Sequence, residues 1–382
     1  MRFVKTACGL ACFLLLASHV WSMSHWNEAR GVYDDACYLR QAHLFQKFGL
    51  DGLDTDISRD DDHYFTEKFQ EMGFPPLTEP NAAPCHNLMP ATKKFVIQYP
   101  PGTGFVLALF PQGFQVIPVF ILSTFALFGF TLLGLSYSRS PSAALLTATF
   151  GCVAIYLMIN PAKASYSMAP TMVACALAGF LTARWFGADR PPASFVFAGL
   201  VGVVIGIAVN FRLPNLFLSS GFFLLLLVSF LSSRRAETAL QGALFGAACL
   251  VGMAPTLIAN TINAGSPFST TYGSADVMPP DFSFGILWSY LGDMQFVLLV
   301  AAATWTILML RWRHAGTGAR RTGLVAAGNL LANAAFFMTH PVITPYYTIP
   351  VSMLTLWSLL FAYLIQEAEA VDGVSLTEAA AA

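Results

Sequence analysis

Long apolar stretches, separated by short polar ones, occupy most of the chain. A membrane-spanning helix needs roughly 20 mostly apolar residues, because every backbone N–H and C=O group must be paired within hydrocarbon. The stretches that approach this length are 3–22, 116–136, 142–160, 165–184, 194–210, 213–232, 239–260, 294–311, 322–339 and 346–366. The pattern predicts an all-α polytopic membrane protein with about ten transmembrane helices.

One long polar segment, residues 23–103, interrupts this pattern and contains 12 of the chain's 21 Asp and Glu residues. We predict a single transmembrane domain over residues 1–366, in which segment 23–103 forms interfacial helices and carries the catalytic groups. The short apolar run Phe105–Phe110 follows it. Flanking prolines and glycines favour a re-entrant or interfacial segment there over an eleventh span. The acidic, alanine-rich residues 367–382 are predicted to be a disordered cytoplasmic tail.

Composition supports the membrane class. Hydrophobic residues make up 56% of the chain and charged residues 11%, which is about half the charged fraction of an ordinary soluble domain. The net charge of -1 and the lack of a long basic run exclude nucleic acid as a partner, because phosphate binding needs clustered Lys and Arg. Membrane lipids are the expected surroundings, and no motif implies a cofactor.

Basic residues predict the orientation, because short cytoplasmic loops retain Lys and Arg. With the N-terminus inside, the cytoplasmic loops carry Arg139, Arg184, Arg190, Arg234, Arg235, Arg311, Arg313, Arg320 and Arg321. The short loops on the opposite side hold only Lys163 and Arg212. This asymmetry predicts a multi-pass protein of the plasma (inner) membrane, with both termini cytoplasmic and segment 23–103 extracytoplasmic.

The first apolar stretch has a second interpretation. Arg2, Lys5, a short apolar core and small residues near Ala17 and Ser22 resemble a secretory signal peptide. The apolar run continues to Trp21 without an A-x-A site, which favours a retained helix. Cleavage would leave segment 23–103 outside as well.

Two cysteines, Cys37 and Cys85, lie in the exterior segment, whereas the other five lie inside predicted helices. An oxidising compartment permits a disulfide between these two. Two free thiols are the alternative.

Ionisable residues at the membrane edge are candidates for function, because charge is costly to bury in hydrocarbon. Asp34 and Asp35 begin a predicted helix just outside the first span, where the helix dipole stabilises carboxylates; simple capping is the alternative. Arg212 stands between two apolar stretches and suits phosphate or carboxylate, with snorkelling as the alternative. Asp293 is predicted at the outer mouth of a helix, and His340 begins the last outer loop.

This layout suits a lipid-anchored anionic substrate whose head group reacts at the outer face. Four short motifs on the predicted exterior side make the resemblance specific: Asp34-Asp35-Ala36-Cys37-Tyr38-Leu39 with Ala42 (D-E/D-x-x-Y-L-x-x-A), Tyr99-Pro100-Pro101-Gly102 (Y-P-P), Ser266–Gly273 (G-x-P-x-x-T-G-Y) and Thr344–Pro350 (R-Y-x-x-P). In their order, they resemble the GT-C superfamily of membrane glycosyltransferases, which includes the protein O-mannosyltransferases and the aminoarabinose transferase of lipid A.

The resemblance implies transfer of a sugar from a polyprenyl-phosphate carrier to a lipid, glycan or protein acceptor, with inversion at the anomeric carbon. By correspondence, Asp34 is the general base, and Asp35 orients it or serves instead. Arg212 pairs with the donor phosphate, with His340 as a second candidate. The remaining substrate-binding candidates are Tyr38, Arg40, Tyr99, Tyr272, Asp293 and Tyr346.

The chain also departs from the family pattern. It is short and has no sizeable soluble C-terminal domain, and Thr344-Pro345 replaces the arginine expected in the late motif, where His340 would supply a polar group. The run Asp60-Asp61-Asp62-His63 is interpreted as a solvated turn, so we assign no metal site. A divalent-cation site is the alternative.

Two other function classes were weighed against an enzyme. A transporter or flippase of lipid-linked intermediates would need charged groups along its pathway, yet the predicted helices carry none away from their ends. No internal repeat typical of transporters is evident either. A non-catalytic assembly scaffold would leave Asp34 dispensable.

Overall fold

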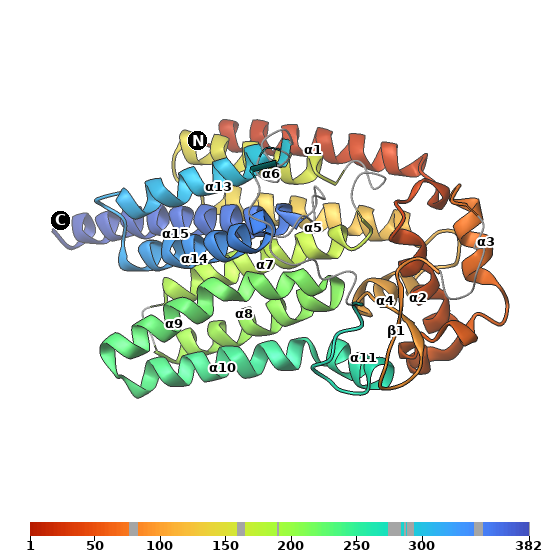
Figure 1. The fold of residues 1–382 in the computed structure, drawn as a ribbon. Coiled ribbons are helices and arrows are strands. Elements are labelled where there is room, and N and C mark those ends of the chain that lie inside the picture. Colours follow the sequence, from red (N-terminus) through yellow and green to blue (C-terminus); the bar gives the residue numbers. More distant parts are fainter. Residues whose placement is uncertain are drawn as a thin grey trace.

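The computed structural model describes residues 1–381 apart from 76–82, 159–164, 189–190, 274–283, 286–287, 289–293 and 340–346. The described chain is mostly helical. Its one sheet is a small antiparallel hairpin of β1 (His86–Leu88) and β2 (Phe95–Ile97). Long helices lie side by side in a bundle, and the smaller elements gather at one end of it (Figure 1).

Each of the ten predicted stretches coincides with a helix or a pair of helices. These are α1 (Arg2–Ser24), α5 (Val116–Tyr137), α6 (Pro141–Tyr156), α7 (Met168–Phe186), α8 (Pro191–Phe211), η6 with α9 (Leu213–Ser219, Ser220–Ser233), α10 with α11 (Ala236–Gly252, Ala254–Ala264), α13 (Met294–Arg311), α14 (Thr317–Thr339) and α15 (Ile349–Ala381).

Among the described residues, six helices are long and apolar enough to cross a membrane: α1, α5, α7, α8, η6 with α9, and α15. The pair α10 and α11 adds a seventh if it is counted as one span, although it bends by 56° at its break. The chain is therefore an all-α, multi-pass membrane protein, and ten spans remain a prediction. α6 and α13 are shorter apolar helices.

α14 is 23 residues long but less apolar, because it carries buried Asn329 and Asn333. The Asn329 side chain accepts a hydrogen bond from the N–H of Gly221 at 2.6 Å, and Asn333 donates to the carbonyl of Phe217 at 3.2 Å. Both amides thus pair with backbone groups at the start of α9, as polar groups inside a membrane must.

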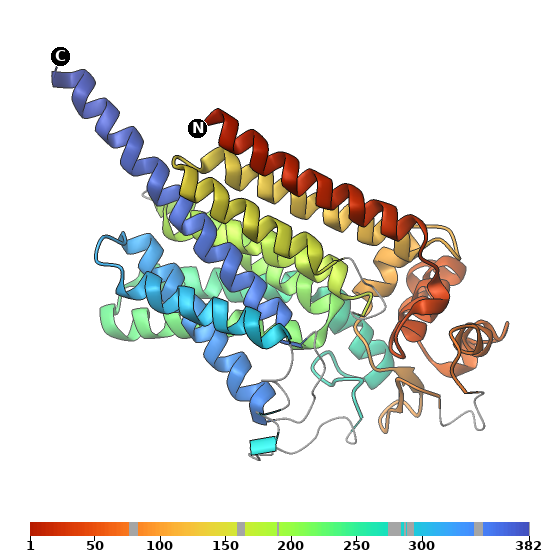
Figure 2. The same cartoon turned by 90° about the horizontal axis from the view of Figure 1, so that it is seen from above.

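The bundle has two chemically different ends. Both termini lie at one end, and the views in Figures 1 and 2 agree on this. At that end, Lys5 donates to the carbonyl of Ser136 at 3.2 Å and Gln366 donates to the carbonyl of His314 at 2.8 Å. Arg184 lies in the last turn of α7, at the same end.

The opposite end carries a compact region that we call the head, consisting of residues 28–114 together with α11. Its further elements are η1 (Glu28–Arg30), α2 (Asp35–Phe48), η2 (Gly49–Leu53), η3 (Ile57–Arg59), α3 (Tyr64–Glu71) and α4 (Gly102–Ala108). α4 contains the run predicted to be re-entrant or interfacial, and its seven residues are too few to cross a bilayer. The Asn263 amide of α11 accepts from the N–H of Thr55 at 3.0 Å, joining distant parts of the chain.

Helix α15 continues to Ala381, through the segment that we expected to be disordered. The alanine and glutamate residues of this segment have high intrinsic helix propensity, which accounts for the continuation. In Figure 2 this helix projects beyond the bundle.

Glycines allow α8 and α10 to approach closely. A Cβ atom on Gly206 would lie 2.9 Å from the Cα of Gly252 and would also meet the carbonyl of Cys249. Small residues at such contacts let membrane helices pack through their backbones. By contrast, a Cβ atom on Gly199, two turns earlier in α8, would meet only the Leu244 side chain at 3.7 Å, an ordinary contact.

We therefore expect Gly206→Ala to destabilise the bundle by about 1–3 kcal/mol through overpacking. Gly199→Ala is the matched control and should have little effect. Thermal stability of the detergent-solubilised protein, followed by size-exclusion chromatography after heating, measures the difference. Equal stability of the two variants would contradict this account of the α8–α10 contact.

Candidate active site

Asp34 stands at the N-terminus of α2, at the N-cap position. The positive end of the helix dipole stabilises a carboxylate there. Tyr38 lies one turn further along α2, and residues four apart share one face of a helix. Asp34 is partly exposed, whereas Tyr38 is buried, so the carboxylate lies at the edge of an otherwise apolar surface.

Three tyrosines form the wall beside Asp34. The ring of Tyr99 stacks on Tyr38 with centroids 4.9 Å apart, and Tyr272 meets Tyr99 edge-on at 6.3 Å. Burial and the charge of Asp34 raise the pKa of Tyr99, and a hydrogen bond to Asp34 raises it further. The Tyr99 phenol therefore remains protonated and can donate to that carboxylate.

Arg212 reaches the same tyrosines from the junction of α8 and η6. It is only 6% exposed, its guanidinium lies 4.8 Å from the ring centroid of Tyr347, and Nη1 lies 3.2 Å from the sulfur of Met168. Burial raises the pKa of Tyr38, while the charge of Arg212 opposes the rise and that of Asp34 adds to it. The structure thus brings an acid and a base from distant segments into one cluster.

Asp35 occupies a different environment from its neighbour. It is fully buried, and its two oxygens accept hydrogen bonds from the N–H groups of Val32 and Tyr166, both at 2.8 Å. Burial raises the pKa of Asp35 well above the usual range, although the two backbone donors favour the carboxylate. Because both oxygens are occupied, Asp35 anchors the segment before α7, and Asp34 is the acid that a substrate can reach.

Arg40 does not join the tyrosine cluster. It is fully buried inside the head, where it donates to the carbonyls of Thr55 at 2.9 Å and Asp56 at 2.8 Å and contacts the Nε2 atom of His86 at 2.7 Å. We therefore assign Arg40 a structural role in place of the substrate-binding role expected from the sequence.

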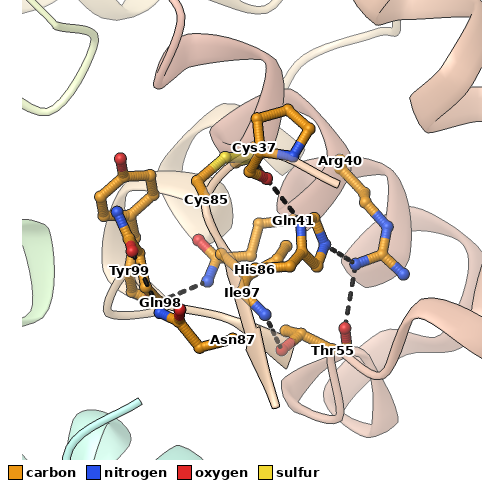
Figure 3. Close-up of a disulfide and its surroundings, with 11 residues drawn as sticks. Cys37, Arg40, Gln41, Thr55, Cys85, His86, Asn87, Ile97, Gln98 and Tyr99 are labelled. Atoms are coloured by element: carbon orange, nitrogen blue, oxygen red, sulfur yellow. Dashed lines mark hydrogen bonds between the residues drawn. A yellow bond between two sulfur atoms is a disulfide. The ribbon is translucent and has the colours of Figure 1, made fainter. Parts of the chain in front are cut away.

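A disulfide joins Cys37 to Cys85 next to these groups (Figure 3). It fixes the start of α2 to the strand segment of the head. Cys37, Cys85 and His86 are also close enough to resemble a metal group, but metals bind cysteine as the thiolate, and these two sulfurs are bonded to each other.

His86 is held as a neutral ring. Its Nδ1 atom lies 2.7 Å from the carbonyl of Pro84, which only a donor can satisfy, so Nε2 is the acceptor for Arg40. Burial and the charge of Arg40 lower the pKa of His86 to about 3.

The acid run that raised the alternative of a cation site is engaged with other partners. Asp60 accepts from the N–H of Phe65 at 3.0 Å and caps α3. Asp61 pairs with Lys47, and Asp62 binds both Lys47 at 3.0 Å and His43 at 2.8 Å. These acids stabilise the junction of α2 and α3.

Three predicted site residues, Asp293, His340 and Tyr346, lie outside the described residues. Two contributors were missed by the sequence analysis. Tyr347 belongs to the late motif, so its position beside Arg212 could have been anticipated. Glu28 had no such signal: its buried carboxylate accepts from the N–H of Gln115 at 2.7 Å and caps α5 across a separation of 87 residues.

The chain matches no protein-family model and no curated protein. The functional argument therefore rests on the geometry of this cluster and on the motifs of the sequence.

We expect Asp35→Asn to lower the free energy of unfolding by about 1–3 kcal/mol, because its NH₂ group would face a backbone N–H donor. Asp34→Asn is the matched control and should change stability by less than about 0.5 kcal/mol. The thermal midpoint of the solubilised protein measures both. A larger loss for Asp34→Asn would reverse the roles assigned to the two acids.

Acid should destabilise the head through His86. The unfolded chain binds a proton near the ordinary pKa of 6.5, whereas the folded chain does so only near 3. Stability is therefore fully present above about pH 6.5 and is lost as pH falls toward about 3. Thermal midpoints measured across this range should show the loss, and His86→Gln should flatten it because Gln keeps an acceptor for Arg40. A variant with the same pH dependence as the parent would exclude His86 as the cause.

Proposed function

We propose that the protein is an inverting glycosyltransferase that moves a sugar from a polyprenyl-phosphate carrier to an acceptor hydroxyl of a lipid, glycan or protein. The observation that supports this most is the meeting of Asp34 and Arg212 at one set of tyrosines. A carboxylate and a guanidinium side by side provide a base for a hydroxyl group and a partner for a phosphate.

The reaction is placed at the outer face of the inner membrane. The cluster lies between the bundle and the head, at the end opposite both termini. Short cytoplasmic loops retain basic residues, and Arg184, Arg234 and Arg311 close α7, α9 and α13 at the end that holds the termini. Both termini are therefore assigned to the cytoplasm.

Asp34 acts as the general base. Its carboxylate takes the proton of the acceptor hydroxyl as the hydroxyl oxygen attacks the anomeric carbon. The bond from this carbon to the carrier phosphate breaks on the opposite face, and the electron pair remains on the phosphate oxygen. Attack opposite the leaving group inverts the anomeric configuration.

Arg212 stabilises the phosphate as negative charge develops on it. A buried guanidinium is effective here, because electrostatic interactions are stronger in a site from which water is largely excluded. Its planar donor group also suits two phosphate oxygens at once. The contact with Tyr347 orients the guanidinium.

Tyr99 holds the base in position. Its ring is fixed by Tyr38, and its main-chain carbonyl accepts from the Gln41 amide at 3.0 Å. A ring held at both points directs its hydroxyl to Asp34, and such support is what a reactive group needs for a defined geometry.

Asp34→Asn should reduce sugar transfer by about 10²–10⁴-fold, the usual contribution of a general base, while carrier binding is retained. Asp61→Asn is the control, because it removes an exposed head acid that pairs with Lys47. Transfer from radiolabelled polyprenyl-phosphate sugars is measured with the purified protein in lipid nanodiscs.

Unchanged transfer in Asp34→Asn would exclude the assigned base. Carrier movement across vesicle membranes without any transfer by the parent protein would favour a flippase instead.

A further inference from the structure

An apolar cavity of about 590 Å³ lies where the head meets α8 and the break between α10 and α11. Its wall includes Phe45 of α2, Leu50, Phe105 of α4, Ile207 and Phe211 of α8, and Ile258 of α11. The volume is within the range of about 300–1,000 Å³ typical of ligand pockets. No ionisable side chain lines it.

The one side-chain amide in this wall is already occupied. Asn210 donates to the carbonyls of Gly252 at 2.8 Å and Gly206 at 3.2 Å. Its oxygen accepts from the N–H and the hydroxyl of Thr256, at 3.0 and 2.7 Å. The side chains of the cavity therefore offer a ligand apolar contact alone, which matches a hydrocarbon chain.

The cavity opens onto the apolar surface of the bundle. Leu50, Ile207 and Ile258 line it and are also among the exposed large hydrophobic residues. In a protein that spans a membrane, such a surface is covered by lipid tails. Because these residues lie at the end of the bundle next to the head, their neighbours are the lipids of one leaflet.

Close backbone packing separates the cavity from the tyrosine cluster. Gly102 lies against Asn210, where an added Cβ atom would come within 2.7 Å of the asparagine, and Gly104 lies equally close to Gln41. Phe45 and Asp34 lie eleven residues apart along α2, or about 16 Å. A chain in the cavity therefore lies on the far side of this wall from Asp34.

We propose that this cavity binds an acyl chain of a bilayer phospholipid, at a site separate from that of the carrier lipid. The separating wall and the lack of a cation in the lining favour this occupant over the carrier, whose phosphate is assigned to Arg212. The bound chain fills the space between α4, α8 and α11 and thereby stabilises the contact between head and bundle.

The test uses the full chain in nanodiscs made with a phosphatidylcholine that carries a diazirine near the middle of one acyl chain. After irradiation, peptide mass spectrometry should find label at Phe105 and Ile258 above the level at Leu224, which is exposed on α9 outside the cavity. Ile207→Trp should abolish the label at Phe105 and Ile258 by filling the cavity. Leu200→Trp is the control, because Leu200 is exposed two turns earlier on α8 and does not line the cavity.

Label at Phe105 and Ile258 no higher than at Leu224 would overturn the proposal. Displacement of the label by added polyprenyl phosphate would overturn it in favour of the carrier. If Ile207→Trp does not yield folded protein, Ile258→Trp is read out at Phe105 instead. The measurement needs no transfer, and Asp34→Asn should keep full labelling, so failure of this proposal and failure of the proposed reaction are distinguishable.

Discussion

The attachment of the head to the bundle depends on the buried carboxylate of Asp35. Its oxygens bind the N–H groups of Val32, just before α2, and Tyr166, just before α7. A buried carboxylate without such donors would be strongly destabilising, so the two segments and the acid hold one another in place. Asp34 is the next residue in the chain, and its position beside the tyrosines follows from this anchor.

The same requirement to pair polar groups shapes the bundle. In hydrocarbon a backbone group without a partner costs several kcal/mol, and Asn210 accordingly satisfies groups on both sides of the break between α10 and α11. The break turns α11 toward the head, where Asn263 binds Thr55. A polar residue in a membrane helix thus determines how a distant loop is held.

Acidic residues in the head divide into those that build it and the one that faces the cluster. Asp60, Asp61 and Asp62 are used in caps and ion pairs, and Glu28 caps α5. Arg40 and His86 form a hydrogen-bonded core beside the Cys37–Cys85 disulfide. Most of the loop's charge therefore stabilises structure, which leaves Asp34 as a partly exposed carboxylate supported by a rigid surround.

The sequence by itself determined the membrane class, the positions of the helices and the asymmetry of charge, because hydrocarbon imposes a length and an apolar character that are visible in any single stretch. It also pointed to Asp34, Tyr99 and Arg212 as candidates. Only the tertiary structure distinguished Asp34 from Asp35 and placed Arg40 in the interior. Two adjacent acids have the same local signal, and their difference arises from an N–H donor 131 residues away. Burial and long-range hydrogen bonds depend on how segments meet, which local pattern does not contain.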